Sequence, residues 1–153
     1  MQENLLKIVA ESKTLEEKLK QIANLIQGKI VFSTSFGIED QVISHAIYSQ
    51  NIKNIEVFTL DTGRLFPETY SVWDKTQLQY NAKIKAYYPN SESIEKYINE
   101  NGINAFYNSV ELRKDCCTIR KVEPLNRALV GASIWITGLR AEPSNNGNSV
   151  KEV

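Results

Sequence analysis

The sequence has no long hydrophobic run and no excess of one charge. No apolar stretch approaches the eighteen or more residues that suggest a membrane span, and the start, Met1-Gln2-Glu3-Asn4, lacks the basic and apolar regions of a signal peptide. We therefore predict no membrane partner and a cytoplasmic location. Lysine plus arginine equal aspartate plus glutamate at 18 each. Without a basic excess, nucleic acid is not an expected partner, although a small anion remains compatible with this composition.

Cysteine and histidine are scarce, and the few that occur narrow the chemistry. The two cysteines are adjacent, at Cys116 and Cys117. A disulfide between neighbours is strained, so a structural bridge is not expected in a reducing cell. Two buried apolar thiols are the ordinary alternative to a functional pair. The single histidine, His45, falls in a predicted helix and is not expected to be a catalyst.

The common nucleotide-binding motifs are also missing. Neither Gly-x-x-x-x-Gly-Lys-Ser/Thr nor Gly-x-Gly-x-x-Gly occurs. Present instead is Ser-Thr-Ser-Phe-Gly-Ile-Glu-Asp at 33–40, between a predicted strand and a predicted helix. Small hydroxyl residues and a glycine let backbone N–H groups point into one concavity that favours an anion. The alternative is that Ser35 caps the helix while Glu39 and Asp40 complement its dipole.

Hydrophobic periodicity predicts strands that alternate with helices. Helical spacing runs through 4–26, interrupted near Ser12–Thr14, and Thr14 with Glu17 forms a capping box. Further helices are expected over 41–48, from Pro67 to about Tyr80, after Ser91, and over 122–130, whereas 103–118 is predicted to be irregular. Strands are expected over 29–33, 55–60, 83–88 and 133–137. This order predicts one doubly wound, mostly parallel α/β domain over 1–153, with 141–153 as a poorly structured or truncated tail.

Polar turns follow three of the four predicted strands. Ligands of such sheets sit outside the carboxyl ends of the strands. The turns Asp-Thr-Gly-Arg at 61–64 and Gly-Leu-Arg at 138–140 therefore join the loop 33–40 as the expected site.

Four stretches, in order, resemble the signatures of the assimilatory sulfonucleotide reductases, which reduce phosphoadenylyl sulfate or adenylyl sulfate. They are the loop at 33–40, Leu-Asp-Thr-Gly-Arg-Leu-Phe at 60–66, Cys-Cys-Thr-Ile-Arg-Lys-Val-Glu-Pro-Leu at 116–125 and Trp-Ile-Thr-Gly-Leu-Arg at 135–140. The resemblance implies a fold of the adenine-nucleotide α-hydrolase type. It also implies a reaction in which a cysteine attacks the sulfate sulfur, AMP or its 3′-phosphorylated form leaves, and thioredoxin or glutaredoxin frees sulfite from the S-sulfocysteine.

The resemblance assigns substrate-binding roles to residues in all four stretches. Cationic side chains suit the sulfate and phosphate oxygens. Asp61 could accept hydrogen bonds from ribose hydroxyls, or it could cap its own turn. Gly63 suits a backbone conformation, or a close ligand approach, that other residues resist. The expected substrate-binding residues are Ser33, Ser35, Phe36, Gly37, Asp40, Asp61, Gly63, Arg64, Lys121, Gly138 and Arg140.

The cysteine pair resembles the first half of a four-cysteine [4Fe–4S] site and marks the adenylyl-sulfate branch. Such a cluster needs four thiolates, so a cluster on Cys116 and Cys117 is expected only if the other pair lies on sequence beyond this chain. The family's nucleophilic cysteine, in a Glu-Cys-Gly-like motif, has no match here. Glu142 also departs from the family, which has glutamine before the serine, and this affects the expected anion contact near Ser144.

Three functions stay open at this stage. The first is reduction of adenylyl sulfate or phosphoadenylyl sulfate by a protein in which this chain supplies the nucleotide site. The second is an ATP pyrophosphatase or adenylyltransferase, which shares the modified phosphate loop but needs no thiolate. The third is a non-catalytic nucleotide-binding fragment. The sequence does not choose between a monomer and a homo-oligomer, although closed dimers are the commonest assembly.

Overall fold

The fold is built on one parallel sheet, seen in a computed structural model that describes residues 14–138 and 151–152. Five strands lie in the order β3-β2-β1-β4-β5, and every neighbouring pair is parallel. Central strand β1 has three consecutive buried residues, because both faces of the sheet are covered. The strands are β1 (Lys29–Ser33), β2 (Ile55–Leu60), β3 (Lys85–Tyr87), β4 (Ala132–Thr137) and β5 (Lys151–Glu152).

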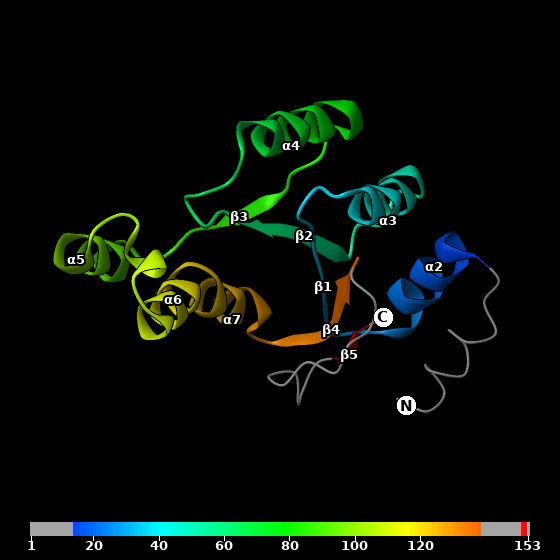
Figure 1. Cartoon of the computed structure of the whole chain (residues 1–153). Coiled ribbons are helices and arrows are strands. Elements are labelled where there is room, and N and C mark those ends of the chain that lie inside the picture. Colours follow the sequence, from blue (N-terminus) through cyan, green and yellow to red (C-terminus); the bar gives the residue numbers. More distant parts are fainter. Residues whose placement is uncertain (1–13, 139–150, 153) are drawn as a thin grey trace.

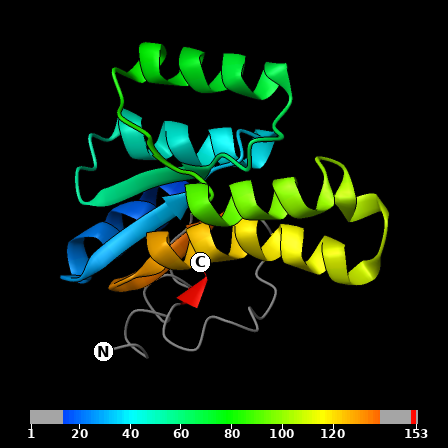
Figure 2. The same ribbon diagram turned by 90° about the vertical axis from the view of Figure 1, so that its left-hand side faces the viewer.

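Helices cover both faces, as Figures 1 and 2 show. On one face, Leu19, Ile22, Ile43 and Ile47 join alternate strand residues in the larger core, with Trp73 packed against it. The opposite face is covered by a smaller core that includes side chains of the last helix before β4. The helices of the first face are α2 (Leu15–Leu25), α3 (Ile38–Ser49) and α4 (Pro67–Tyr80), and the last helix is α7 (Glu123–Leu129).

The chain reverses its direction across the sheet at β1. From β1 it moves outward to β2 and β3, and it then returns to place β4 on the other side of β1, in register Ser33↔Thr137. The predicted doubly wound, mostly parallel α/β fold is therefore confirmed. In such a sheet a crevice forms outside the carboxyl ends of the two neighbouring strands at which the strand order reverses. Here these strands are β1 and β4.

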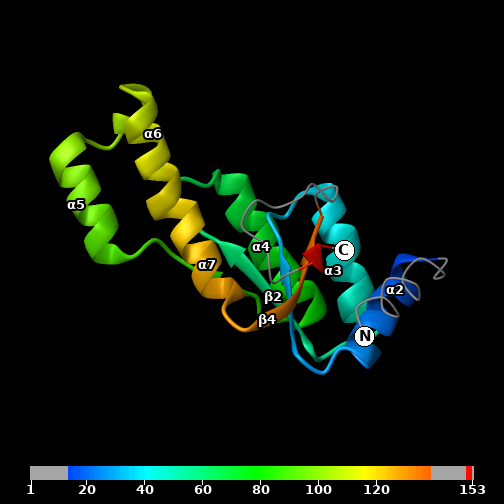
Figure 3. The ribbon, with the colours of Figure 1, turned by 90° about the horizontal axis from the view of Figure 1, so that it is seen from below.

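Between β3 and β4 the chain forms a helical arm, defined here as residues 90–122. It contains α5 (Ser91–Asn101), a short 3-10 helix η1 (Ala105–Tyr107), α6 (Val110–Cys117) and a π-helical turn η2 (Thr118–Val122) that runs on into α7. Figure 3 shows α5 and α6 side by side, reaching away from the sheet. The prediction that 103–118 is irregular is wrong over 110–117. Ser109 caps α6 through its Oγ, which accepts from Leu112 N at 3.1 Å.

Other boundaries differ by a few residues from those expected. Helix α3 begins at Ile38 rather than near Gln41, and β3 is shorter than the predicted strand 83–88. Thr14 is confirmed as the N-cap of α2, because Thr14 Oγ1 accepts from Glu17 N at 3.1 Å. The sequence indicates no strand after Thr137, yet β5 pairs with β4. The predicted helix before Ser12 and most of the predicted tail lie outside the described residues.

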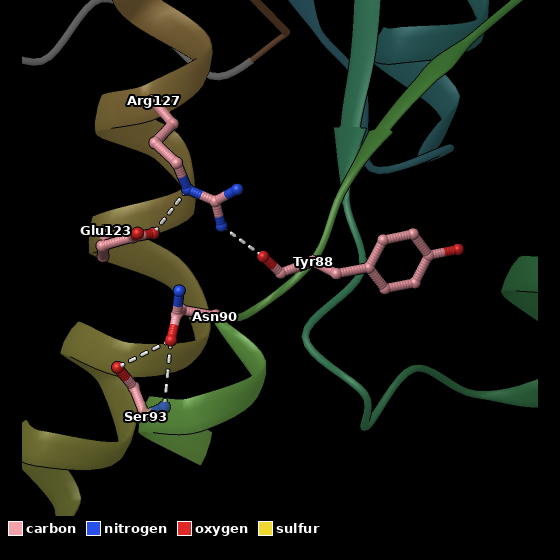
Figure 4. Close-up of polar contacts among 5 residues, drawn as sticks. All are labelled: Tyr88, Asn90, Ser93, Glu123 and Arg127. Atoms are coloured by element: carbon pink, nitrogen blue, oxygen red, sulfur yellow. Dashed lines mark hydrogen bonds and ion pairs between the residues drawn. The ribbon is translucent and has the colours of Figure 1, made fainter. Parts of the chain in front are cut away.

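Side chains near the start of the arm link α7 to the segment that leaves β3 and cap α5, as Figure 4 shows. Arg127 of α7 donates through Nε to Glu123 at 2.8 Å and through Nη2 to the carbonyl of Tyr88, just past β3. Asn90 then caps α5, accepting from Ser93 N at 3.1 Å. Among the described residues, no helix is long and apolar enough to cross a membrane.

Candidate functional site

The loop after β1 is held together by its own polar groups. Thr34 N donates to Phe58 O at 2.9 Å, which extends the pairing with β2 by one residue. The N–H and hydroxyl of Ser35 both donate to Asp40 Oδ2, at 2.8 and 2.7 Å. Phe36 N donates to Thr34 Oγ1 at 3.0 Å. Two of the loop's N–H groups are therefore occupied within the loop.

This arrangement changes both readings of the loop. The expectation that Ser35 caps α3 is wrong, because the N-cap is Gly37 and its position has no side-chain capping bond. The expectation of a row of N–H groups along the loop is wrong at Ser35 and Phe36, whose N–H groups are occupied. The donors that suit an anion are instead those of the first turn of α3, which every helix start leaves without an intrahelical partner.

Phe36 shapes the loop through its backbone rather than through an exposed ring. Its φ of 65° lies in the left-handed region that few non-glycine residues adopt. Its side chain is buried in the larger core and stacks on Trp73, with ring centroids 5.7 Å apart. Such strain concentrates at functional turns when packing holds it in place. The structure therefore gives the Phe36 backbone a role in shaping the loop, and its ring a role in the core.

Gly138 brings the end of β4 close to the start of α3. A Cβ at position 138 would lie 2.1 Å from Asp40 Oδ1 and 3.2 Å from Asp40 N, so any side chain there would have to displace Asp40. The Asp40 carboxylate, 8% exposed, thus lies between Ser35 and Gly138, at the crevice. Ser33 also lies at this edge, where its Oγ accepts from Trp135 Nε1 at 2.9 Å. The two motif stretches 33–40 and 135–138 therefore meet.

The turn after β2 is organised by Asp61. This buried residue accepts through Oδ1 from Gly63 N at 2.8 Å and from the Tyr70 hydroxyl at 2.9 Å. Burial, together with the hydrogen bond and negative charge of Asp61, raises the pKa of Tyr70, which keeps the phenol a donor at neutral pH. Gly63 has a φ of 82°, which confirms the expected backbone conformation. The capping role of Asp61 is thus present, and its Oδ1 is already engaged.

The expected cations have different surroundings. Lys121 is exposed, and Arg140 lies outside the described residues. Arg64 turns toward the arm, donating to Ile103 O at 3.2 Å and to Asn104 Oδ1 at 3.1 Å. The cation that reaches the turn is Arg120, which donates through Nη1 to Thr62 O at 2.7 Å.

Arg120 and Tyr70 are the site residues that sequence reasoning missed. Arg120 is only 7% exposed, its Nε has no partner among the described residues, and no carboxylate of that part of the chain pairs with it. A signal was available in principle, since Arg120 follows Cys116 by four residues and so shares its helix face. The expectation of an irregular segment up to Thr118 hid this spacing.

The cysteine pair divides between interior and surface. Cys116 is buried in the arm's own core with Tyr97 and Ala105, whereas Cys117 is exposed. Burial, together with the neighbouring Cys116 and Asp115 side chains, raises the pKa of Tyr97. Among the described residues no three potential ligands gather as a metal site, and a cysteine-ligated cluster needs four thiolates. The chain's own residues do not complete such a site.

A cavity lies at the opposite edge of the sheet. It has a volume of about 870 Å³ and is lined by residues at the amino ends of β1, β2 and β3, among them Lys29, Ile55 and Lys85. The described residues of the motif stretches 33–40, 60–66 and 135–138 lie at the carboxyl ends of β1, β2 and β4. We place the site at the carboxyl ends, because the topology puts ligands of doubly wound sheets there.

A doubly wound parallel sheet with polar turns at its reversal point is typical of the class of α/β nucleotide-binding domains. The chain belongs to the phosphoadenosine phosphosulfate reductase domain family, whose model matches residues 29–152. It is 53% identical over 136 residues to the adenosine 5′-phosphosulfate reductase of Rhizobium meliloti strain 1021, covering 89% of this chain and 51% of that protein. It is 43% identical over 137 residues to the enzyme of the same name from Burkholderia cepacia, covering 90% and 54%.

A solved structure shares the fold. The phosphoadenylyl-sulfate (PAPS) reductase from Candida auris, crystallised as a phosphate complex, superposes with a TM-score of 0.79 at 22% identity, over 100% of this chain and 78% of that one. This match confirms the adenine-nucleotide α-hydrolase-like fold. The chain spans about half the length of the curated relatives it matches.

Proposed function

We propose that this chain supplies the nucleotide site of a sulfonucleotide reductase, which reduces adenylyl sulfate or phosphoadenylyl sulfate to sulfite and releases AMP or its 3′-phosphorylated form. The observation that carries the proposal is that the four motif stretches contact one another in two pairs, at the turns that follow β1, β2 and β4. Asp40 joins the loop after β1 to Gly138 after β4. Arg120, four residues after Cys116, reaches the turn after β2.

The sulfonucleotide's anionic groups would lie against the first turn of α3, where unpaired N–H groups and the positive end of the helix favour negative charge. Lys121 and Arg140 would contact the sulfate and phosphate oxygens, and Asp61 would face the ribose. The fork of arginine suits two anionic oxygens at once, and lysine supplies a point charge. Gly37 and Gly63 would let the ligand approach the backbone closely.

The chemical step would use a cysteine beyond this chain's two. That thiolate would attack the sulfate sulfur and form an enzyme S-sulfocysteine as the nucleotide leaves with the electrons of the broken sulfur–oxygen bond. Thioredoxin or glutaredoxin, each a dithiol reductant, would then release sulfite and become oxidised. A [4Fe–4S] cluster remains a prediction, with Cys116 and Cys117 as two of its four ligands. We expect the reaction in the cytoplasm.

Calorimetry on the full-length protein tests the binding site. We expect adenylyl sulfate and AMP to bind, and Lys121→Gln and Arg140→Gln each to weaken adenylyl sulfate roughly tenfold or more, since a charged hydrogen bond contributes about 1.5–3 kcal/mol. Lys114→Gln is the matched control, because Lys114 is exposed on α6. A folded full-length protein that binds neither nucleotide would sink the proposal.

Turnover separates the remaining functions. Sulfite release from adenylyl sulfate with reduced thioredoxin supports the reductase, and repetition with phosphoadenylyl sulfate identifies the preferred substrate. Cleavage of ATP to AMP and pyrophosphate would instead support the pyrophosphatase alternative. Nucleotide binding without either reaction would leave a non-catalytic binding domain. The visible absorption of anaerobically purified protein reports whether a cysteine-ligated cluster is present.

A further inference from the structure

The helical arm has a core of its own. Tyr97, Ala105 and Cys116 are buried together, with Leu112 and Ile119 packed against them, and none of these residues belongs to either core of the sheet. Satellite clusters of this kind are less tightly bound to the rest of a domain than the main core is. The arm carries the cysteine pair, so its position relative to the turn 61–64 decides where those thiols lie.

Arg120 reaches from the arm to the turn. Its Nη1 donates to Thr62 O at 2.7 Å, and a Cβ on Gly63 would lie 3.1 Å from the same nitrogen. The guanidinium therefore lies directly against the turn that Asp61 organises. Because Arg120 is buried and four residues after Cys116, its side chain fixes the helix face on which that cysteine lies.

Arg64 reaches in the opposite direction, from the turn to the arm. Its Nη1 and Nη2 donate to Ile103 O and Asn104 Oδ1, and its guanidinium carbon lies 4.7 Å from the centre of the Phe106 ring. One face of the guanidinium thus stacks on η1 while its edge holds the preceding loop. A planar fork can make both contacts at once, which a lysine cannot.

We propose that Arg64 and Arg120 form a two-arginine clasp that fixes the cysteine-bearing arm against the turn 61–64. Through this clasp, binding of a ligand at the turn also reduces the motion of the arm. Arg120 reaches from the arm to the turn, and Arg64 reaches from the turn to the arm. Both are positioning residues, and their importance for catalysis rests on the proposed function. Because Arg120 bonds the Thr62 carbonyl between Asp61 and Gly63, a ligand that stiffens this turn also stiffens the anchor of the arm.

Hydrogen–deuterium exchange of the full-length protein tests the clasp without a ligand. Arg64→Met and Arg120→Met keep the apolar stem and remove the donors. We expect exchange of the amides in α5 and α6 to accelerate roughly tenfold or more in each variant, as expected for local opening after loss of a charged hydrogen bond. Arg64→Lys and Arg120→Lys should restore only part of the protection. Arg113→Met, at an exposed position on α6, should exchange like the parent protein.

The ligand arm of the experiment separates positioning from simple stability. In the parent protein, saturating adenylyl sulfate should slow exchange at the turn and also in α6. In folded Arg120→Met or Arg64→Met, protection at the turn should persist while protection in α6 is lost. If buried Arg120→Met does not fold, exposed Arg64→Met carries the test.

The outcomes also separate this proposal from the proposed function. Arm exchange in both arginine variants that matches Arg113→Met would overturn the clasp, even if adenylyl sulfate binds. Undiminished ligand protection of α6 in folded Arg64→Met would show that the ligand's effect on the arm does not pass through the clasp. A parent protein that binds no adenylyl sulfate would defeat the proposed function, whereas the ligand-free exchange rates would still decide whether the two arginines hold the arm.

Discussion

Asp40 shows how much of the site depends on single side chains. One of its oxygens accepts two hydrogen bonds from Ser35, and the other lies where a side chain at position 138 would have to be. The carboxylate therefore sets the shape of the loop after β1 and the spacing between β1 and β4 at their carboxyl ends. A change at any of these three residues is expected to reach the other two.

Gly138→Ala tests this dependence. The added methyl group would lie 2.1 Å from Asp40 Oδ1, so Asp40 and the start of α3 must move. Overpacking of this kind costs about 1–3 kcal/mol, and we expect the free energy of unfolding in urea to fall by that amount, with adenylyl sulfate affinity falling as well.

Gly37→Ala is the matched control. A Cβ there would have its nearest neighbours, Asp40 Oδ2 and Glu39 Oε2, at 3.9 Å, and the φ of Gly37 is −72°. Alanine is a poorer N-cap residue than glycine, so the stability of Gly37→Ala should fall slightly, but less than that of Gly138→Ala. A large loss of affinity in Gly37→Ala then reports that the methyl group blocks the ligand. Equal stability of the two alanine variants would contradict the steric role of Gly138.

For single residues, the sequence predicts which ones lie near the site better than it predicts the contacts that each one makes. The motif stretches contain Ser35, Asp40, Gly63 and Gly138, and all of them lie at the carboxyl edge. Their contacts depend on partners distant in the chain, which no local pattern contains. Arg120 is the clearest case, because its partner Thr62 is 58 residues away.

Helix ends matter most in the arm, because its elements are short and its core is small. Helix α6 has eight residues and is capped by Ser109, and α5 is capped by Asn90 (Figure 4). In a regular helix the N–H at position 124 would donate to the carbonyl of Arg120. Pro124 has no N–H, and its ring crowds that carbonyl. The wider turn η2 precedes this proline, at a place where helices commonly bulge.

Asn90→Ala and Ser109→Ala are therefore expected to loosen the arm alone. Loss of a cap costs about 1 kcal/mol, so exchange of the α5 or α6 amides should accelerate roughly fivefold while amides of β1 keep their protection. Thr14→Ala removes the equivalent cap of α2 and serves as control. It should leave the arm unchanged, and faster arm exchange in Thr14→Ala would show that the arm is not an independent unit.

Elements with strong periodicity or clear end signals could be predicted from the sequence, including α2, α4, β1 and β2. Helix α6 could not, because Val110 and Tyr107 are exposed apolar residues that blur its pattern, and only Leu112 and Cys116 mark its inner face. Strand β5 has two residues and no pattern of its own. Its pairing depends on the edge that β4 offers.

The molecule as a whole should lose stability in strong alkali through a buried phenol. Burial raises the pKa of Tyr48 to about 12, and its hydroxyl has no partner among the described residues. A folded-state pKa above the ordinary value gives a stabilising contribution that is complete below about pH 10 and is lost as the pH rises toward that pKa. We expect the free energy of unfolding to fall over this range and to fall less steeply in Tyr48→Phe.

Urea unfolding at a series of alkaline pH values measures this slope. Tyr70 and Tyr97, whose pKa values are also raised, should keep part of the slope in the Tyr48→Phe variant. Tyr107→Phe, at an exposed position, should match the parent protein. Identical slopes for Tyr48→Phe and the parent protein would show that Tyr48 does not resist ionisation in the fold.

The overall architecture could be predicted from the alternation of strands and helices, because that alternation leaves few topologies other than a doubly wound parallel sheet. The strand order could not be read from periodicity. It depends on which strand the returning chain meets, and the smaller core, with Val31 from β1, Phe58 from β2 and Ala128 from α7, forms only in the folded state.

The pairing of β1 with β4 also dictates when the site can exist. Trp135 Nε1 reaches Ser33 Oγ across a separation of 102 residues, whereas β1 meets β2 within a much shorter stretch. During synthesis, domains fold as the chain emerges, and distant pairings form last. The growing chain would therefore leave the ribosome with one edge of β1 unpaired, an exposed strand edge of the kind that recruits other chains. Closure by β4 completes the crevice and removes that hazard in the same event, so the proposed nucleotide site would form only when the nascent chain is past its most aggregation-prone stage.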